Sequence, residues 1–298
     1  MNTKELQQLR DKTFDYEDNQ QHFVGSHFDA FFEDMQEEVM TQIPVMMDNS
    51  TVITSNYVGE EELPEDEGWQ KGHILTSPSE NLNEGLGIIV GIIEEEKSLQ
   101  LISMFPHLDY GQNYELELLK VYVWSNGHEA QLEVDLGFTS LFFYDIYYDL
   151  NRKWYLRGNR YMFQILGIAY RARYRVEKEI NIEMRPELLE AMESISKETV
   201  RTISLVGMSS FLGIDGWDKD DYSFSGIIQK VQEIDVSISN EKGWICTTRV
   251  LVEGSDENDK IYDMDILVTQ KTWHETQAPK AGDDIEGSVW MQGKVVTQ

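Results

Sequence analysis

LRGNRYMFQILGIAYRA (residues 156–172) and PKAGDDIEGSVWMQGKV (residues 279–295) are the two stretches that decide the predicted fold. Each begins in a polar turn that contains a glycine and then enters a long, mostly apolar run typical of a strand. When the two are laid side by side, Gly158 matches Gly282. The match is one of pattern and not of residue identity, and it predicts an internal repeat.

The strands around these stretches extend the same pattern. The blocks 113–176 and 221–298 each hold a long first strand, a second strand after a polar turn and a third strand that ends in a loop. In the first block Leu116 and Leu118 alternate with glutamates, a period of two residues that indicates half-buried antiparallel strands. A five-strand block with this layout resembles the OB-fold, a small Greek-key barrel. A single larger sandwich built from the same strands is the alternative.

The N-terminal third combines a predicted helix with predicted strands. Five apolar residues recur every three or four positions and predict one helical stripe: Phe28, Phe31, Phe32, Met35 and Val39. A strand is predicted at 50–58, an exposed acidic loop at 60–68 and a hairpin over 86–105. A second helix is predicted to begin at Pro186, with a stripe that reaches Ile203.

These patterns together predict an α+β, mainly β protein. Its expected core is two small antiparallel β-barrel (OB-like) or sandwich units joined by a helix, after an N-terminal mixed region. The predicted domains are an N-terminal α/β region with the acidic loop at 1–108, a first barrel-like domain at 109–180, a helical linker at 181–216 and a second barrel-like domain at 217–298. A chain of this length is long enough for more than one domain.

The charge balance is the strongest feature of the whole chain. The 298 residues include 54 acidic and 25 basic side chains, a formal net charge of −29. Such a field repels nucleic acid phosphates and anionic lipid surfaces and attracts basic partners. Two interpretations stay open: the charge serves solubility or a salt-adapted proteome, or it forms a surface that binds a basic protein.

The composition also indicates a compartment. No apolar run approaches the roughly 20 residues that a bilayer-spanning helix needs, and the first residues lack the apolar core of a secretory signal. Cys246 is the single cysteine, so an intrachain disulfide is excluded. We therefore expect a cytoplasmic protein that does not interact with membranes.

Motifs for catalysis or for cofactor binding are not found in the sequence. Cys246 stands in an alternating strand pattern and is expected to be a small buried residue. The six histidines lack the spacing of a zinc site. The acidic run 215–221 departs from the register of a calcium loop, so we interpret it as a solvated loop. The sequence thus predicts no metal and no cofactor.

One basic cluster contrasts with the acidic chain. Eight cationic side chains lie between residues 152 and 178, beside the single acid Glu177. Three of the arginines alternate along one strand and should share one face. With nearby tyrosines the cluster could bind a phosphate or a single strand, as basic and stacking side chains do in OB barrels. The candidate ligand-binding residues are Arg157, Arg160, Arg171, Arg173, Arg175, Tyr161 and Tyr170.

An internal pairing of this cluster is the preferred alternative. Glu129, Glu133 and Asp135 form an acidic ladder with the same period in the same block. Cross-strand pairs of opposite charge contribute about 0.2–1 kcal/mol each. The arginines would then be neutralised by a neighbouring strand, and the anionic exterior would be the working surface.

Three function classes follow from these observations. The preferred one is a non-enzymatic acidic protein that binds a basic protein partner, as an immunity or inhibitor protein does. The second is an OB-type module that binds single-stranded nucleic acid or a phosphorylated ligand at the face from Arg171 to Arg175. The third is a carboxylate-dependent enzyme, because 54 acidic residues must include close pairs.

Overall fold

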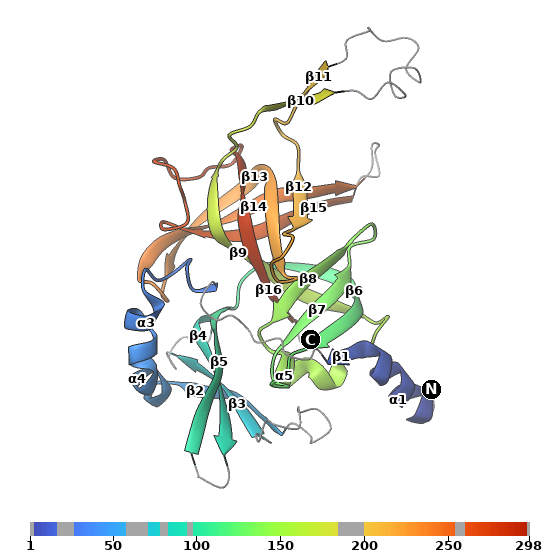
Figure 1. Cartoon of the computed structure of the whole chain (residues 1–298), viewed down its shortest axis with the longest axis vertical. Coiled ribbons are helices and arrows are strands. Elements are labelled where there is room, and N and C mark those ends of the chain that lie inside the picture. Colours follow the sequence, from blue (N-terminus) through green and yellow to red (C-terminus); the bar gives the residue numbers. More distant parts are fainter. Residues whose placement is uncertain are drawn as a thin grey trace.

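The computed structural model shows a mainly β protein (Figure 1). The residues that it describes are 3–16, 27–57, 71–77, 83–93, 98–183, 200–253 and 260–296. These residues form a four-stranded sheet, a ten-stranded sheet and a two-stranded pair that projects from one end of the molecule. The mainly β class predicted from the sequence is confirmed.

The N-terminal part holds short helices and the four-stranded sheet. The helical segments are α1 (Thr3–Thr13), α3 (Met35–Glu38), the 3-10 turn η1 (Met40–Gln42) and α4 (Ile43–Asp48). The sheet follows the chain order in antiparallel pairs: β2 (Thr51–Tyr57), β3 (Lys71–Ser77), β4 (Glu84–Ile93) and β5 (Ser98–Leu108). The predicted strand at 50–58 and the predicted hairpin are thus confirmed, whereas the loop at 60–68 lies outside the described residues.

The predicted N-terminal helix exists in shorter pieces than its periodicity indicated. Phe28 and Val39 are fully buried, so the apolar stripe does face the core. The chain turns before α3, however, and Asp34 caps that helix by accepting a hydrogen bond from the backbone N of Glu37 at 3.0 Å. An N-cap side chain fixes where a helix begins. Pro44, expected beyond the helix end, lies inside α4.

The ten-stranded sheet contains both predicted strand-rich blocks. Its strands are β1 (Phe14–Tyr16), β6 (Gln112–Val123), β7 (Ala130–Asp135), β8 (Ser140–Asp145), β9 (Arg160–Tyr174), β12 (Ser210–Gly213), β13 (Asp221–Val236), β14 (Glu241–Glu253), β15 (Lys260–Thr269) and β16 (Asp284–Val295). Their order is β1-β6-β7-β8-β16-β9-β15-β14-β13-β12, with further pairings of β6 to β9 and of β16 to β13. Between β8 and β9 lie α5 (Tyr148–Asn151) and the 3-10 turn η3 (Arg152–Trp154).

These pairings close two rings of five strands. One ring runs β6-β7-β8-β16-β9 and returns to β6, and the other runs β13-β14-β15-β9-β16 and returns to β13. The long strands β9 and β16 therefore belong to both rings (Figure 1). Both shared strands come from the two stretches that the repeat pattern singled out.

The pairings around the shared strands repeat in the two halves of the sheet. β9 and β16 pair antiparallel, β8 pairs parallel with β16, and β15 pairs parallel with β9. Gly158 and Gly282, which the sequence pattern matched, both adopt a positive φ, at 81° and 91°. Glycine is the residue that adopts this backbone region without strain. The same turn therefore precedes each shared strand.

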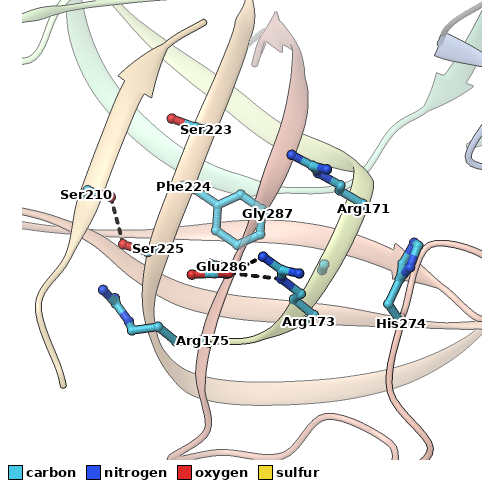
Figure 2. Close-up of a pocket in the computed structure, with 11 residues that line it drawn as sticks. Arg171, Arg173, Arg175, Ser210, Ser223, Phe224, Ser225, His274, Glu286 and Gly287 are labelled. Carbon is cyan, nitrogen blue, oxygen red and sulfur yellow. Dashed lines mark hydrogen bonds and ion pairs between the residues drawn. The ribbon is translucent and has the colours of Figure 1, made fainter. Parts of the chain in front are cut away.

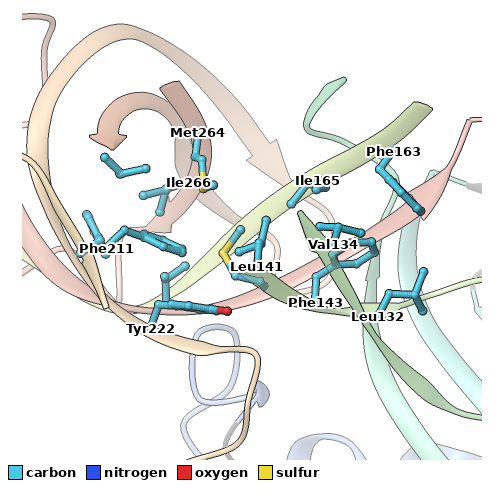
Figure 3. Packing of buried hydrophobic residues seen from close by; sticks show 14 of the residues in the cluster. Leu132, Val134, Leu141, Phe143, Phe163, Ile165, Phe211, Tyr222, Met264 and Ile266 are labelled. Carbon is cyan, nitrogen blue, oxygen red and sulfur yellow. The ribbon is translucent and has the colours of Figure 1, made fainter. Parts of the chain in front are cut away.

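A single apolar cluster fills both rings (Figure 3). Leu132, Phe143 and Phe163 represent the first ring in this cluster, and Phe224 and Ile266 represent the second. The alternation of buried and exposed residues along β6 and β7 explains why one face of these strands joins the cluster. A second cluster, which includes Phe105 of β5, Leu166 of β9 and Trp290 of β16, packs the four-stranded sheet against the shared strands.

The second predicted helix, which begins at Pro186, is wrong at its C-terminal end, the only part of it that the structure describes. Residues Val200–Ser204 form strand β11, which pairs antiparallel with β10 (Glu179–Glu183), and Ile180 lies opposite Ile203. The remainder of that prediction, 186–199, lies outside the described residues. β-Branched residues such as Val200, Thr202 and Ile203 favour a strand once a partner strand is present, and the helical spacing did not reveal that partner.

Within the described part of the chain, no helix combines the length and apolarity needed to cross a bilayer. The predicted domain division at 109–180 and 217–298 stays a prediction. The strands β9 and β16 pair along their length across that division.

Candidate functional site

Three alternating arginines, Arg171 and Arg173 of β9 and Arg175 directly after it, line a surface pocket of about 340 Å³ (Figure 2). The pocket spreads over four neighbouring strands, β9, β16, β13 and β12. Its other lining residues are Ala172, Ser210, Ser223, Phe224, Ser225, His274, Glu286 and Gly287. We call it the arginine pocket. Its volume lies near the lower limit of typical ligand sites.

Arg175 fixes one wall of the arginine pocket. Its side chain is buried, and its Nε donates to Oδ1 of Asp284 at 2.9 Å. Its guanidinium also donates to the carbonyl of Met208, and Asp284 Oδ2 accepts from the backbone N of Gly207 at 3.0 Å. This pair therefore holds the turn that leads into β12 against β16, so Arg175 acts as a structural clamp.

Arg173 forms an ion pair but stays exposed to solvent. It lies opposite Glu286 in the register of β9 and β16, and its guanidinium contacts the Glu286 carboxylate at 2.8 Å. The Arg173 side chain nevertheless stays 55% exposed. An exposed pair of this kind is worth about 0–1 kcal/mol and can exchange partners. Arg173 is thus able to turn toward a bound anion.

Arg171 is the free cation of the arginine pocket. Its side chain is exposed, and no carboxylate pairs with it among the described residues. Figure 2 shows it on the side of the pocket that His274 also lines. The opposite side carries hydroxyls, of which Ser210 and Ser225 lie 2.7 Å apart. Unpaired guanidinium and hydroxyl groups together are typical of sites that bind carboxylate or phosphate.

The predicted partner strand of the arginines is wrong. Strand β7, which follows Glu129 and contains Glu133 and Asp135, pairs with β6 and β8 and not with β9. Glu129 accepts from Ser103, Asn126 and Tyr144, and Glu133 accepts from Tyr122. The acids that face the arginines come from β16, more than 100 residues further along the chain. The acidic ladder and the arginines have the same two-residue period, but this shared period did not identify the strand that pairs with the arginines.

The other candidate residues lie elsewhere. Arg157 and Arg160 are exposed at the opposite end of β9, where Arg160 is 3.9 Å from Glu115. The Tyr161 hydroxyl accepts from Leu156 N at 3.0 Å and donates to the Trp154 carbonyl at 2.6 Å. Both bonds hold a local turn, so Tyr161 is not available for stacking in the arginine pocket.

Tyr170 is also engaged inside the fold. Its hydroxyl donates to Oδ1 of Asp221 at 2.6 Å, and its ring contacts Trp217 edge-on at 5.7 Å between centroids. The register of β9 and β16 is irregular at this position, since Arg171 lies opposite Ser288 and Ala169 lies opposite Val289. The structure therefore brings together Arg171, Arg173 and Arg175 only.

Sequence reasoning missed the hydroxyl side of the pocket. Ser223 and Ser225 alternate with buried Tyr222 and Phe224, so the pattern did place both serines on one face of β13. The sequence likewise placed Glu286 next to buried Ile285 on β16, on the other face of that strand. His274 lies in a loop with no period, and backbone hydrogen bonds hold that loop to β9, among them the one from His274 N to the Ala172 carbonyl at 2.9 Å. No local signal marked His274.

Buried carboxylates form a separate feature of the core. Asp220 is fully buried, accepts from Gln131 Nε2 at 2.7 Å and from Trp290 Nε1 at 3.1 Å, and has a pKa raised by desolvation and by Asp221. Burial likewise raises the pKa of Asp145 to about 7. A raised pKa suits a general acid. Neither group lines the arginine pocket, and the carboxylate enzyme stays a prediction.

Metal and thiol chemistry gain no support from the described residues. They contain no group of three or more potential metal ligands, the acidic run 215–221 included. Cys246 is buried as predicted, and desolvation raises its pKa to about 12. A thiol of that kind is inert as a nucleophile.

Comparison of the chain with protein-family models, with curated proteins and with solved structures finds no match. The functional argument therefore depends on the geometry of the site.

Proposed function

We propose that this protein binds a small anionic ligand, a phosphorylated or carboxylated molecule, in the arginine pocket. The observation that carries the proposal is Arg171, an exposed guanidinium that pairs with no carboxylate of the described residues, in a pocket that also offers serine hydroxyls. In a chain of net charge −29, a cation left unpaired beside so many acids needs a reason. Binding an anion supplies one.

The charges of the pocket support an anionic ligand. Among the described residues, Arg173 pairs with Glu286 and Arg175 pairs with Asp284, which leaves the positive charge of Arg171 in excess. A ligand phosphate or carboxylate could accept from Arg171 and Arg173 together. Of the Ser210 and Ser225 hydroxyls, one donates to the other, and the second keeps its proton for a further ligand oxygen. Hydrogen bonds to charged groups contribute about 1.5–3 kcal/mol each. Two such contacts suffice for a specific but modest affinity.

The contacts inside the pocket favour binding and not turnover. Ser210 and Ser225 hydrogen-bond to one another, and the Ser223 hydroxyl donates to the Leu212 carbonyl at 3.3 Å. None of these serines contacts His274 among the described residues. An activated serine needs a base within hydrogen-bond reach. The pocket therefore offers recognition without an assembled nucleophile.

The proposed OB-like character of the rings agrees with a small ligand. OB barrels bind oligonucleotides on the face of their second and third strands. Those positions would correspond to β14 and β15 in the second ring, whereas the arginine pocket lies over β9, β16, β13 and β12. Among the described lining residues, no Phe, Tyr or Trp ring is exposed, because Phe224 is 2% exposed. The imidazole of His274 is the one exposed ring of this described lining, which is a small platform for stacked bases.

Calorimetric titration tests the proposal, with inorganic phosphate and glucose 6-phosphate as probes at about 20 mM ionic strength, where screening is weak. We expect Arg171→Ala to weaken binding about tenfold, the loss of one charge-assisted hydrogen bond. Arg160→Ala is the matched control, because it removes one exposed arginine from the same strand outside the pocket. Absence of binding to the native protein, or equal weakening by both variants, contradicts the proposal.

A basic protein partner is a second proposal, supported by a different observation. Four large apolar side chains are exposed between residues 206 and 217: Val206 at 60%, Met208 at 49%, Leu212 at 63% and Trp217 at 54%. Asp215 and Asp218 are exposed on either side of the tryptophan. Tryptophan and a charged rim are typical of interface hot spots. Titration of Trp217 fluorescence with a Lys- and Leu-containing peptide tests this surface, and an unchanged response in Trp217→Ala contradicts it.

A further inference from the structure

The basic cluster of the sequence divides into two sites at opposite ends of β9. Arg160 and Arg171 are eleven positions apart on one strand, which corresponds to about 35 Å at 3.3 Å per residue. Arg171 belongs to the arginine pocket. The cations before Arg160 lie beside α1 and β1 at the other end (Figure 1). They form a second site that the proposed function does not use.

This second site is a pocket of about 580 Å³ between the N-terminal segment and the α5–η3 segment. Arg10 and Phe14 come from α1 and β1, and Arg152 and Lys153 come from η3. Strand β1 pairs parallel with β6, which fixes the N-terminal wall. The backbone N of Arg157 also donates to Thr13 Oγ1 at 3.0 Å and joins the two walls. We call it the aromatic pocket.

The charges of the aromatic pocket are mostly positive. Among the described residues, Arg10, Arg152 and Lys153 line it together with one acid, Asp11. Arg152 lies 3.8 Å from Asp149. Lys153 is exposed, with its Nζ 5.1 Å from the centre of the Trp154 ring. In a strongly acidic chain this is a second local concentration of cations.

Aromatic rings distinguish this pocket from the arginine pocket. Tyr16 lines it and is 48% exposed, and Trp154 beside it is 42% exposed. Phe14 and Tyr148 supply further apolar lining. Exposed aromatic rings next to cations form the usual platform for nucleobases, because every base has a stacking face and a nearby phosphate.

We propose that the aromatic pocket binds a nucleotide. Its base would stack on Tyr16, and its phosphate would contact Lys153 and Arg10. The same chemistry is present in a free nucleotide and in single-stranded nucleic acid. Binding needs the Tyr16 ring as well as the charges of Lys153 and Arg10. Inorganic phosphate would gain only the electrostatic part of the binding free energy, because it has no base to stack.

Fluorescence titration at about 20 mM ionic strength tests the site, with AMP, a ten-residue oligouridine and inorganic phosphate as separate probes. We expect AMP to bind at least tenfold more tightly than phosphate because of base stacking. Tighter binding of the oligouridine identifies single-stranded nucleic acid as the source, and tighter binding of AMP identifies the free nucleotide. No binding of either nucleotide probe, or affinity for AMP no better than for phosphate, overturns the proposal.

Matched variants separate this site from the arginine pocket. Tyr16→Ala should weaken AMP binding about tenfold, while Tyr16→Phe keeps the ring and should retain it. Lys153→Glu should also weaken AMP binding, whereas Lys280→Glu makes the same change at an exposed lysine outside both pockets. Loss of AMP binding in Arg171→Ala, with Tyr16→Ala unaffected, would place the nucleotide in the arginine pocket and overturn the assignment. If phosphate does not bind at Arg171, the proposed function fails, but the AMP titration still decides whether the aromatic pocket binds a nucleotide.

Discussion

The two ends of β9 carry cations in two different settings. At one end Arg173 and Arg175 face Glu286 and Asp284 of β16, above an apolar core. At the other end Arg152 and Lys153 stand beside exposed aromatic rings. The segment between Asp145 and Tyr155 below them contains buried titratable groups, and His128 contacts Asp149 there at 3.0 Å with both side chains fully buried. One basic run in the sequence thus gives two sites whose properties depend on their neighbours.

The largest expected difference between the two ends is in their response to pH. Burial raises the pKa of Asp145 to about 7, and Asp145 accepts hydrogen bonds from the Tyr155 hydroxyl and from Tyr147 N. Between the usual aspartate pKa of 3.8 and about 7, the folded protein keeps a proton that the unfolded chain has released. The free energy of unfolding therefore falls as pH rises through this window and levels off above it.

Asp145→Asn should remove the part of this dependence that comes from Asp145, while the part that comes from buried Asp220 remains in both proteins. From pH 5 to pH 8 the native protein should lose about 3 kcal/mol relative to the variant, at 1.36 kcal/mol per pH unit. Urea unfolding at a series of pH values measures the difference. The control Asp235→Asn changes an exposed aspartate paired with Lys242 and should leave the slope unchanged. Parallel curves for native protein and Asp145→Asn would show that Asp145 is ionised in the fold.

The next largest effect should come from the clamp at the arginine pocket. Asp284→Ala leaves the buried Arg175 guanidinium and Gly207 N without their partner. Removing one member of a buried pair costs about 3–5 kcal/mol, and we expect about 2 kcal/mol here because Asp284 is 20% exposed. Glu286→Ala, on the same strand and facing the more exposed Arg173, should cost less than about 1 kcal/mol. Equal losses in urea unfolding would contradict the distinction between clamp and ligand residue.

Strand positions were predictable from the sequence, and strand partners were not. The alternation in β6 and β7 and the apolar runs of β9 and β16 are local properties, so periodicity found them. The pairing of β9 with β16 joins residues more than 100 positions apart and depends on ring closure. The glycine turns at Gly158 and Gly282, together with the similar strand layout of the two blocks, were the signs that these two strands correspond.

The same limit explains what was predicted of the candidate site. The shared face of Arg171, Arg173 and Arg175 follows from alternation alone and is correct. Their acidic partners were assigned to the nearby ladder at Glu129 and Glu133, because sequence distance was the available guide. Tyr170 contacts Asp221 and Trp217 instead of lining the pocket, and no local pattern indicated those two partners. The face of a strand on which a residue lies could be predicted from the sequence. Which distant strands and loops come together around the pocket could not.

The smallest expected change in stability accompanies a gain in binding. Glu286→Gln removes the carboxylate that neutralises Arg173 but keeps a side chain of the same shape. The exposed pair contributes little to folding, so the free energy of unfolding should change by less than about 0.5 kcal/mol. Affinity for glucose 6-phosphate should instead rise about fivefold, because Arg173 becomes free to bind the anion and the like charge of Glu286 is gone.

This gain should be confined to the arginine pocket. AMP binding at the aromatic pocket, measured on the same variant, should stay within about twofold of the native value, because the two pockets share no described lining residue and salt screens charges that are further apart than about 10 Å. A rise in AMP affinity equal to the rise for glucose 6-phosphate would mean that both probes enter one site. The two ends of β9 would then form a single ligand site in function, and the contrast between them would be structural only.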